Sequence, residues 1–442
     1  MQAKKSGLTG QFARYVTPSV VSMIIFSFYT MADGLFVAHG VGEKALAAVN
    51  LSAPYNSIIF AVGLLMAVGT STVIAVSLGR GDEDEACRIF SQNICVVAFI
   101  AIAISILTLL NLERFAIFLG ADSKTLVYVK QYVGTIAPFA IFFMVSYNLE
   151  VLVKTDGTPA LSVVGVTCAG LSNVFLDWLF VIKFHWGVWG AAFATGLAQV
   201  FSTLIFLSYF IFKSHKLKLR RFKPQLGIYR RIVPLGLADS ITDMSNGIVL
   251  FLYNHTILTV IGVGGVVCYT VIGYINTLVI MIISGVSQGI QPLISFHHGK
   301  KEQSVCRRFY TMGLLTAVIF GIAAFLISFF FAGGFVGMFL ESDSPSFPMG
   351  VGALKLYAWS FLFAGYNIVT AAYFTATEHP RLSLPISLGR GLLFPALSLA
   401  ILPSVIGENG VWLSAVAAEV ICLLLTTGFL IMHQRRAKNY RN

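Results

Sequence analysis

The longest polar connection in the chain is KSHKLKLRRFKPQLGIYRR, residues 213–231, and it lies at the middle of a strongly apolar sequence. Of the 442 residues, 57% are apolar and only 11% are charged, whereas about a quarter of a soluble protein is charged. The apolar runs on both sides are continuous and reach the roughly 20 residues that a membrane helix needs. The composition therefore predicts an all-α integral membrane protein. It excludes a soluble multidomain enzyme and a disordered chain, and it argues against a membrane β-barrel, whose strands alternate.

Six apolar spans precede the polar connection and six follow it. This arrangement predicts a first lobe over 1–212, a cytoplasmic linker over 213–231 and a second lobe over 232–442. The spans expected from the apolar runs are 14–37, 46–78, 90–110, 126–150, 160–183, 188–212, 233–258, 263–297, 309–332, 350–376, 383–405 and 410–433.

The distribution of Lys and Arg predicts the orientation of these spans. With twelve spans, 23 of the 30 basic residues lie on the side that holds both termini, 6 lie on the other side, and Arg390 lies within a span. Cytoplasmic loops of membrane proteins carry the excess of basic residues. Both termini of this multi-pass chain are therefore expected in the cytoplasm.

The two halves of the sequence are similar to each other. GTSTVIAVSLGRGD at 69–82 aligns with GIQPLISFHHGKKE at 289–302, and TDGTPALS at 155–162 resembles TEHPRLS at 377–383. GVW occurs at 187–189 and again at 410–412. Because each half has an even number of spans, the repeats have parallel topology, related by an axis along the membrane normal. Transporters built in this way commonly bind substrate between the halves and rock them alternately.

Other classes of function leave no signature in the sequence. The net charge of +11 is explained by the positive-inside bias, so no nucleic-acid partner is expected. The six cysteines form no CxxC pair, and His297 and His298 are adjacent and point in different directions on a helix, so no metal site is expected there. No Walker A motif and no Ser/His/Asp pattern occurs. We therefore expect no enzyme activity and no cofactor, and transport driven by an ion gradient.

Carboxylates within the spans are the best candidates for functional residues, because placing one at mid-bilayer costs about 2.5–3.5 kcal/mol. Asp33 lies in the first span, in FYTMADGLFV. Asn173 and Asp177 lie four residues apart in LSNVFLDWLFV and share a helix face. Oxygen ligands of this kind suit a small hard cation, and a buried carboxylate could instead carry a proton. The alternative for Asp177 is an interfacial anchor near Lys183.

Four further acids lie in predicted spans, and their interpretation is more open. Asp239 and Asp243 are spaced i, i+4 in PLGLADSITDMSNG, which suits a cationic substrate or proton handling, or hydrated acids at a helix start. Glu150 lies four residues before Lys154, which favours a local ion pair. Glu419 lies in the middle of the last span and could pair with Arg390. These residues are candidates for a substrate or secondary proton site.

The motifs together resemble the multidrug and toxic compound extrusion (MATE) family, most closely its bacterial members. The resemblance covers roughly residues 10–430 and is carried by a set of segments, of which no single one is specific: MADGLFVAHGVGEKALAAVNLSAP, GTSTVIAVSLGRGDEDEA, VLVKTDGTPALSVVGVTCAGLSNVFLDWLFV, GVWGAAFATGLAQV and SGVSQGIQPLISFHHGKKE. The resemblance implies two six-helix lobes around a central cavity, a monomer, and cation-coupled export of amphipathic, usually cationic compounds.

The resemblance also implies an ion site in the first lobe. The family places an Asp in helix 1, an Asn and an Asp four apart in helix 5, and a Thr in helix 6, and this chain has Asp33, Asn173, Asp177 and Thr195 there. In the second repeat the Asn/Asp pair has no counterpart, so the lobes are not expected to be functionally equal. Acids of the family's second lobe vary in position, and Asp239 and Asp243 are near them without clear equivalence.

Two other functions are weighed against export. A lipid or polysaccharide flippase of a related superfamily branch would need several intramembrane basic residues for an anionic headgroup, and this chain has Arg390 alone. A receptor or scaffold without transport would not need the buried carboxylates. The sequence leaves the substrate open, as well as the choice between H⁺ and Na⁺ as coupling ion.

Overall fold

The structure is a computed structural model that describes residues 7–40, 43–341 and 343–439; at 33–35, 37–40, 43–47 and 436–439 it describes the backbone alone. Within these ranges every regular element is helical. Ten helical segments are long and apolar enough to cross a membrane, and a pair bent by 40°, α13 with α14, gives an eleventh. The remaining span, α9, is 32 residues long, but Asp239, Asp243 and other polar residues make it less apolar than the others.

Several spans are built from more than one helical element, because prolines and π-helical turns interrupt them. The fourth span is broken at Pro138, which cannot donate a backbone hydrogen bond. The fifth and eleventh contain the π-helical turns η2 and η4. In chain order the spans are α1 (Leu8–Gly40), α2 (Glu43–Arg80), α3 (Glu83–Leu110), α5 (Leu126–Ile136) with η1 (Ala137–Phe139) and α6 (Ala140–Thr155), α7 (Ala160–Asp177) with η2 (Trp178–Lys183), α8 (Gly187–Phe212), α9 (Tyr229–Val260), α10 (Val263–Gly299), α11 (Gln303–Phe330), α13 (Ser346–Ala358) with α14 (Phe361–Ala376), α15 (Pro380–Leu388) with η4 (Gly389–Leu393) and α16 (Phe394–Ile406), and α17 (Glu408–Asn439).

Short helices lie in three of the connections: α4 (Leu112–Phe118), η3 (Leu226–Ile228) and α12 (Ala332–Gly337). Helix α3 begins at an N-cap, because the Asp82 side chain accepts a hydrogen bond from the backbone N–H of Glu85 at 2.8 Å. Acidic side chains at the start of α3 also face the positive end of the helix dipole.

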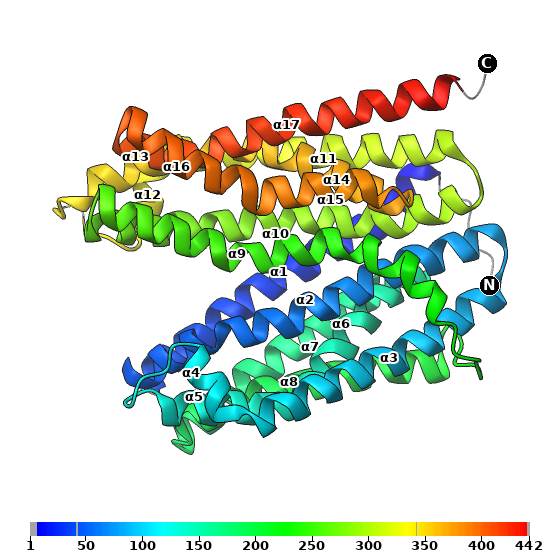
Figure 1. The fold of residues 1–442 in the computed structure, drawn as a ribbon, viewed down its shortest axis with the longest axis horizontal. Coiled ribbons are helices and arrows are strands. Elements are labelled where there is room, and N and C mark those ends of the chain that lie inside the picture. Colours follow the sequence, from blue (N-terminus) through cyan, green and yellow to red (C-terminus); the bar gives the residue numbers. More distant parts are fainter. Residues whose placement is uncertain (1–6, 41–42, 342, 440–442) are drawn as a thin grey trace. The chain divides into compact units, whose positions relative to one another are not determined.

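The chain divides into two compact units. Unit 1 comprises residues 1–240 and 295–302, and unit 2 comprises 241–294 and 303–442. In unit 1, α1 packs on α7, α7 on α8, and α2 on α3 and α6, and these helices lie together in the blue to green part of Figure 1. In unit 2, α11 packs on α14, and α17 packs on α14 and α16.

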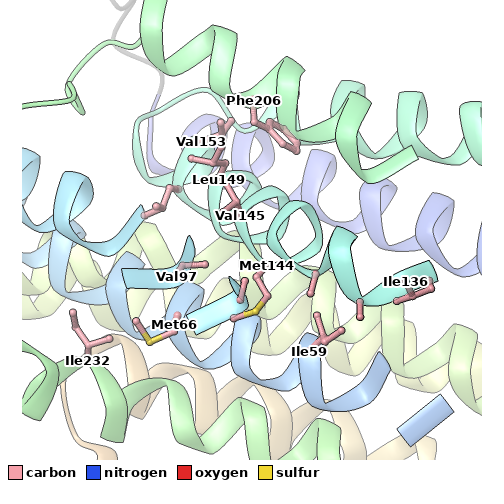
Figure 2. Packing of buried hydrophobic residues seen from close by; sticks show 14 of the residues in the cluster. Ile59, Met66, Val97, Ile136, Met144, Val145, Leu149, Val153, Phe206 and Ile232 are labelled. Carbon is pink, nitrogen blue, oxygen red and sulfur yellow. The ribbon is translucent and has the colours of Figure 1, made fainter. Parts of the chain in front are cut away.

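The apolar core of unit 1 is continuous from α2 to α8. Figure 2 shows Ile59 and Met66 of α2 beside Met144 of α6, with Val97 of α3 and Phe206 of α8 in the same cluster. These side chains are all at least nine-tenths buried. The cluster fixes the helices on which the polar residues described below are placed.

Reciprocal contacts between repeat-related glycines join α2 to the end of α10 that belongs to unit 1. A Cβ on Gly79 would lie 2.0 Å from the carbonyl oxygen of Phe296, and one on Gly299 would lie 2.2 Å from that of Val76. Residues 76 and 79 correspond to 296 and 299 at the repeat offset of 220. Only glycine permits this approach of the two backbones.

The two units differ from the sequence-based lobes 1–212 and 232–442 at their boundaries. The start of α9, through Ser240, groups with unit 1, and so does the end of α10. The physical reason is close backbone packing: a Cβ on Gly236 would lie 1.8 Å from the carbonyl oxygen of Leu65, and one on Gly69 would lie 2.1 Å from that of Ile232.

Candidate cation site in the first lobe

Asn173 and Thr195 meet between α7 and α8. The Asn173 Nδ2 donates to the Thr195 Oγ1 at 3.4 Å, and the Thr195 Oγ1 in turn donates to the carbonyl oxygen of Ala191 at 2.9 Å. The Asn173 side chain is buried, and its Oδ1 accepts no hydrogen bond within the described residues. An acceptor oxygen in that state is unusual, because buried polar groups are nearly always hydrogen-bonded.

Asp177 lies one turn beyond Asn173 on the same face of α7. It is 0% exposed, and it is the last residue of α7 before the π-helical turn Trp178–Lys183. Such turns occur frequently at functional sites, because they shift the register of the side chains that follow. The sequence left open an interfacial anchor, but a residue with no exposed surface does not fit one. The Lys183 ammonium lies over the Trp178 ring, 5.7 Å from its centroid.

The structure thus brings three of the four predicted site residues to one place: Asn173, Asp177 and Thr195. The fourth, Asp33, is in α1, which packs against α7, but its side chain lies outside the described residues. Oxygen atoms of a carboxylate, an amide and a hydroxyl form the donor set that a small hard cation prefers. A proton on the buried carboxylate is the other charge-neutralising solution.

Glu150 and Lys154 form a buried ion pair within α6. The Lys154 Nζ lies 3.2 Å from the Glu150 Oε1, and the two side chains are 1% and 8% exposed. This is the local i, i+4 pair that the sequence favoured. The carboxylate of Glu150 is therefore already neutralised by a lysine on its own helix.

Glu419 and Arg390 also form an ion pair, at 2.9 Å between the Arg390 Nε and the Glu419 Oε1. The sequence left this pairing open. The second carboxylate oxygen, Oε2, accepts from the Asn367 Nδ2 at 2.7 Å.

Asn367 is a site residue that the sequence analysis missed. It is 0% exposed in the middle of α14, in FLFAGYNIVTAAYF. A lone amide inside an otherwise apolar span was a usable signal, because a polar side chain in a membrane helix needs a partner.

Asp239 and Asp243 are half-buried in α9. They lie on either side of the boundary at residues 240 and 241 between the two units. Their spacing places them on one face of α9, as the sequence predicted. Among the described residues, neither carboxylate has a hydrogen bond or an ion pair to another side chain.

Comparison with known proteins identifies the family. The profile of the MatE family matches residues 18–179 and 245–397, which together make up more than half of the chain. The chain belongs to the MatE family. The prediction made from the sequence motifs is thereby confirmed, and the chain is a membrane transporter of this family.

Similar proteins cover almost the whole chain. The multidrug export protein MepA of Staphylococcus saprophyticus is 23% identical over 428 residues, covering 95% of this chain and 93% of that protein. MepA of Staphylococcus aureus is 24% identical over 434 residues, with coverage of 95% and 93%. These names describe the relatives.

Solved structures of the MatE fold superimpose closely on this chain. An outward-facing multidrug resistance MATE family transporter of the MOP superfamily matches with a TM-score of 0.92, 22% identity and full coverage of both chains. A MOP superfamily transporter from Pyrococcus furiosus matches with a TM-score of 0.90, 22% identity and 98% coverage of each chain. This likeness confirms the predicted fold: all-α, with twelve membrane helices in two six-helix lobes.

Asp156 is a buried acid that the sequence did not single out, and in this MatE chain it holds the start of the linker. Its carboxylate accepts hydrogen bonds from the backbone N–H groups of His215, Lys216 and Leu217 at 2.7–2.8 Å and from the Tyr209 hydroxyl at 2.6 Å. All four donors lie more than fifty residues away along the sequence, so no local pattern could have revealed them.

Proposed function

We propose that this MatE transporter is a cation-coupled antiporter that exports amphipathic, mainly cationic drugs or toxic compounds by alternating access. The coupling ion, H⁺ or Na⁺, binds in the first lobe at Asp33, Asn173, Asp177 and Thr195. The observation that carries this proposal is the buried group formed by Asn173, Asp177 and Thr195, in which the Asn173 Oδ1 accepts no hydrogen bond from any residue that the structure describes.

The chemistry of this group supports an exchangeable ion. A fully buried carboxylate is costly in its charged form unless a cation or a proton neutralises it. A ligand shifts a conformational equilibrium only as far as it binds one state better than the other. Ion binding between α7 and α8 would therefore favour one packing of the first lobe, and ion release would favour another.

The pairing of the other acids supports this choice of site. Glu150 is paired with Lys154 and Glu419 with Arg390, so these two carboxylates already have cationic partners. Asp239 and Asp243 have no such ion pair with any described residue and remain candidates for binding a cationic substrate or a second proton. The named activity of the MepA relatives, multidrug export, agrees with the export of drugs.

The setting proposed for this activity is a bacterial inner membrane with both termini in the cytoplasm. The excess of basic residues on the terminal side supports this orientation. We expect the protein to work as a monomer, with small-molecule substrates and the lipid bilayer as its only partners and with no cofactor.

Ethidium efflux from an efflux-deficient bacterium tests the proposal. Wild type is compared with Asp33→Asn and Asp177→Asn at matched membrane expression, in the presence and absence of sodium and with a protonophore. Export by wild type and its loss in both variants is expected. The control is Asp343→Asn, which makes the same change at an exposed loop carboxylate and should leave export intact.

Each alternative result has a definite meaning. Efflux that survives both substitutions would remove the ion site from the first lobe and direct attention to Asp239 and Asp243. A well-expressed wild type that exports no cationic dye would contradict multidrug export and favour a flippase that moves a lipid-linked or polysaccharide substrate.

A further inference from the structure

The two repeats place different charges at related positions on their fifth helices. Pro159 stands at the start of α7 and Pro380 at the start of α15. The hydroxyls of Ser162 and Ser383, three residues on, donate to the carbonyl oxygens of these prolines. This offset of 221 residues makes the segment from α15 through η4 to α16 the counterpart of α7 and η2.

Packing supports the same correspondence. A Cβ on Gly170 of α7 would lie 3.1 Å from Tyr29 of α1, and a Cβ on Gly391 of η4 would lie 3.2 Å from Thr242 of α9. Gly170 and Gly391 are related by the offset of 221, and each approaches the first helix of its own repeat. The π-helical turns of the two spans lie at different positions, because η2 follows Asp177 whereas η4 corresponds to residues 168–172 of α7.

At this offset the second repeat lacks the residues of the first-lobe site. Phe394 stands where Asn173 stands in the first repeat, and Ser398 where Asp177 stands. The second repeat instead carries Arg390, which corresponds to Ala169, one turn before Asn173. A guanidinium thus occupies the second lobe near the position at which the first lobe offers oxygen ligands.

The partner of this guanidinium comes from the matching sixth helix. The GVW repeat relates α8 to α17 with an offset of 223, which places Glu419 opposite Gly196, the residue after Thr195. The contact between Asn173 and Thr195 and the ion pair of Arg390 with Glu419 therefore join corresponding helices.

We propose that Arg390 is a tethered cation that permanently fills the second lobe's counterpart of the ion site, so that ion coupling is confined to the first lobe. Arginine remains charged at every accessible pH, so its guanidinium cannot leave as an ion or a proton does. It neutralises Glu419, while Asn367 holds the other carboxylate oxygen. The inference rests on the proposed function, since it assumes an exchangeable ion at Asp177.

The direct test removes the tethered charge from a protein that has lost the first-lobe site. The thermal unfolding midpoint of the purified full-length protein is measured with and without sodium, and at high and low proton concentration. Wild type should be stabilised by the coupling ion, and Asp177→Asn should abolish this stabilisation. Persistent stabilisation of Asp177→Asn would count against the proposed function and not against the role of Arg390.

Adding Arg390→Gln to Asp177→Asn should restore an ion-dependent rise in the midpoint, because Glu419 then needs an exchangeable cation. Adding Glu419→Gln as a third change should remove that rise again. Arg381→Gln, at an exposed arginine in α15, is the matched control and should restore nothing. If Arg390→Gln folds and restores no ion dependence, the inference is overturned.

A second variant decides the question if Arg390→Gln does not fold. Arg390→Gln combined with Glu419→Gln in the otherwise wild-type chain removes both charges and leaves none buried alone. The inference predicts that this pair variant folds and exports with the wild-type dependence on the ion. Failure to fold, or a changed ion dependence of export, overturns the inference and makes the pair part of the coupling machinery.

Discussion

Loss of the Asp156 carboxylate should release the start of the linker. Asp156→Ala removes an acceptor that holds the backbone N–H groups of three successive linker residues, His215 to Leu217, at 2.7–2.8 Å. A hydrogen bond to a charged group contributes about 1.5–3 kcal/mol. Three bonds to one carboxylate are not additive, so we expect the substitution to destabilise the bound position of the linker by about 3 kcal/mol in total. At about 1.4 kcal/mol per tenfold, the population with a released linker should rise ~100-fold.

Cys87 reports on this release. Its Sγ is buried beneath the linker, 3.2 Å from the carbonyl oxygen of Lys216 and 3.4 Å from the backbone nitrogen of Lys218. Reaction of Cys87 with a maleimide, in a protein with Cys95→Ser and Cys168→Ser, should therefore accelerate by about two orders of magnitude in Asp156→Ala, following the population of the open form.

The matched control for this experiment is Asp122→Ala. The Asp122 carboxylate also accepts two backbone N–H groups and a hydroxyl, from Lys124 and Thr125, but it is exposed and all its donors belong to its own turn. Its loss should leave the Cys87 labelling rate unchanged. An equal rate for Asp156→Ala and wild type would refute the account of the linker clamp.

Three further predictions concern stability. Glu150→Gln takes from the buried Lys154 the carboxylate 3.2 Å away and should cost about 3 kcal/mol, the low end for breaking a buried pair, seen as a lower thermal midpoint. Gly236→Ala should lower the thermal unfolding midpoint strongly, because its Cβ would lie 1.8 Å from a carbonyl oxygen of α2. Gly247→Ala, on the same helix, should leave the midpoint unchanged, because a Cβ there would meet nothing within 4 Å. Burial lowers the pKa of His379 from its ordinary 6.5, so the folded state binds fewer protons than the unfolded state. The free energy of unfolding should therefore fall as pH drops below about 6.5 and through the lowered pKa. His379→Gln should flatten that part of the curve of thermal midpoint against pH.

The helical architecture was largely predictable, because the length of the apolar runs decides it. The interruptions of the helices could not be predicted. The span predicted over 350–376 is bent by 40° between α13 and α14, at a place with no proline. The π-helical turns η2 and η4 depend on packing against neighbouring helices, which leaves no mark in a single sequence.

The polar residues show the same division. The pair of Glu150 with Lys154 was predictable because both belong to one helix turn. The pair of Arg390 with Glu419 joins η4 to α17, and its formation depends on the rotation of the two elements, which the sequence left open. The environment of Asp156 consists of backbone N–H groups, which every residue except proline has, so sequence reasoning could not find it.

The central claim is that the first-lobe site drives export. Ethidium transport is measured in liposomes that contain the purified protein, under an imposed sodium or proton gradient. Wild type is compared with Asp177→Asn and with the exposed control Asp343→Asn. We predict that the gradient of one ion drives transport by wild type and the control and drives none by Asp177→Asn. Transport by Asp177→Asn that still follows the imposed gradient would contradict the claim.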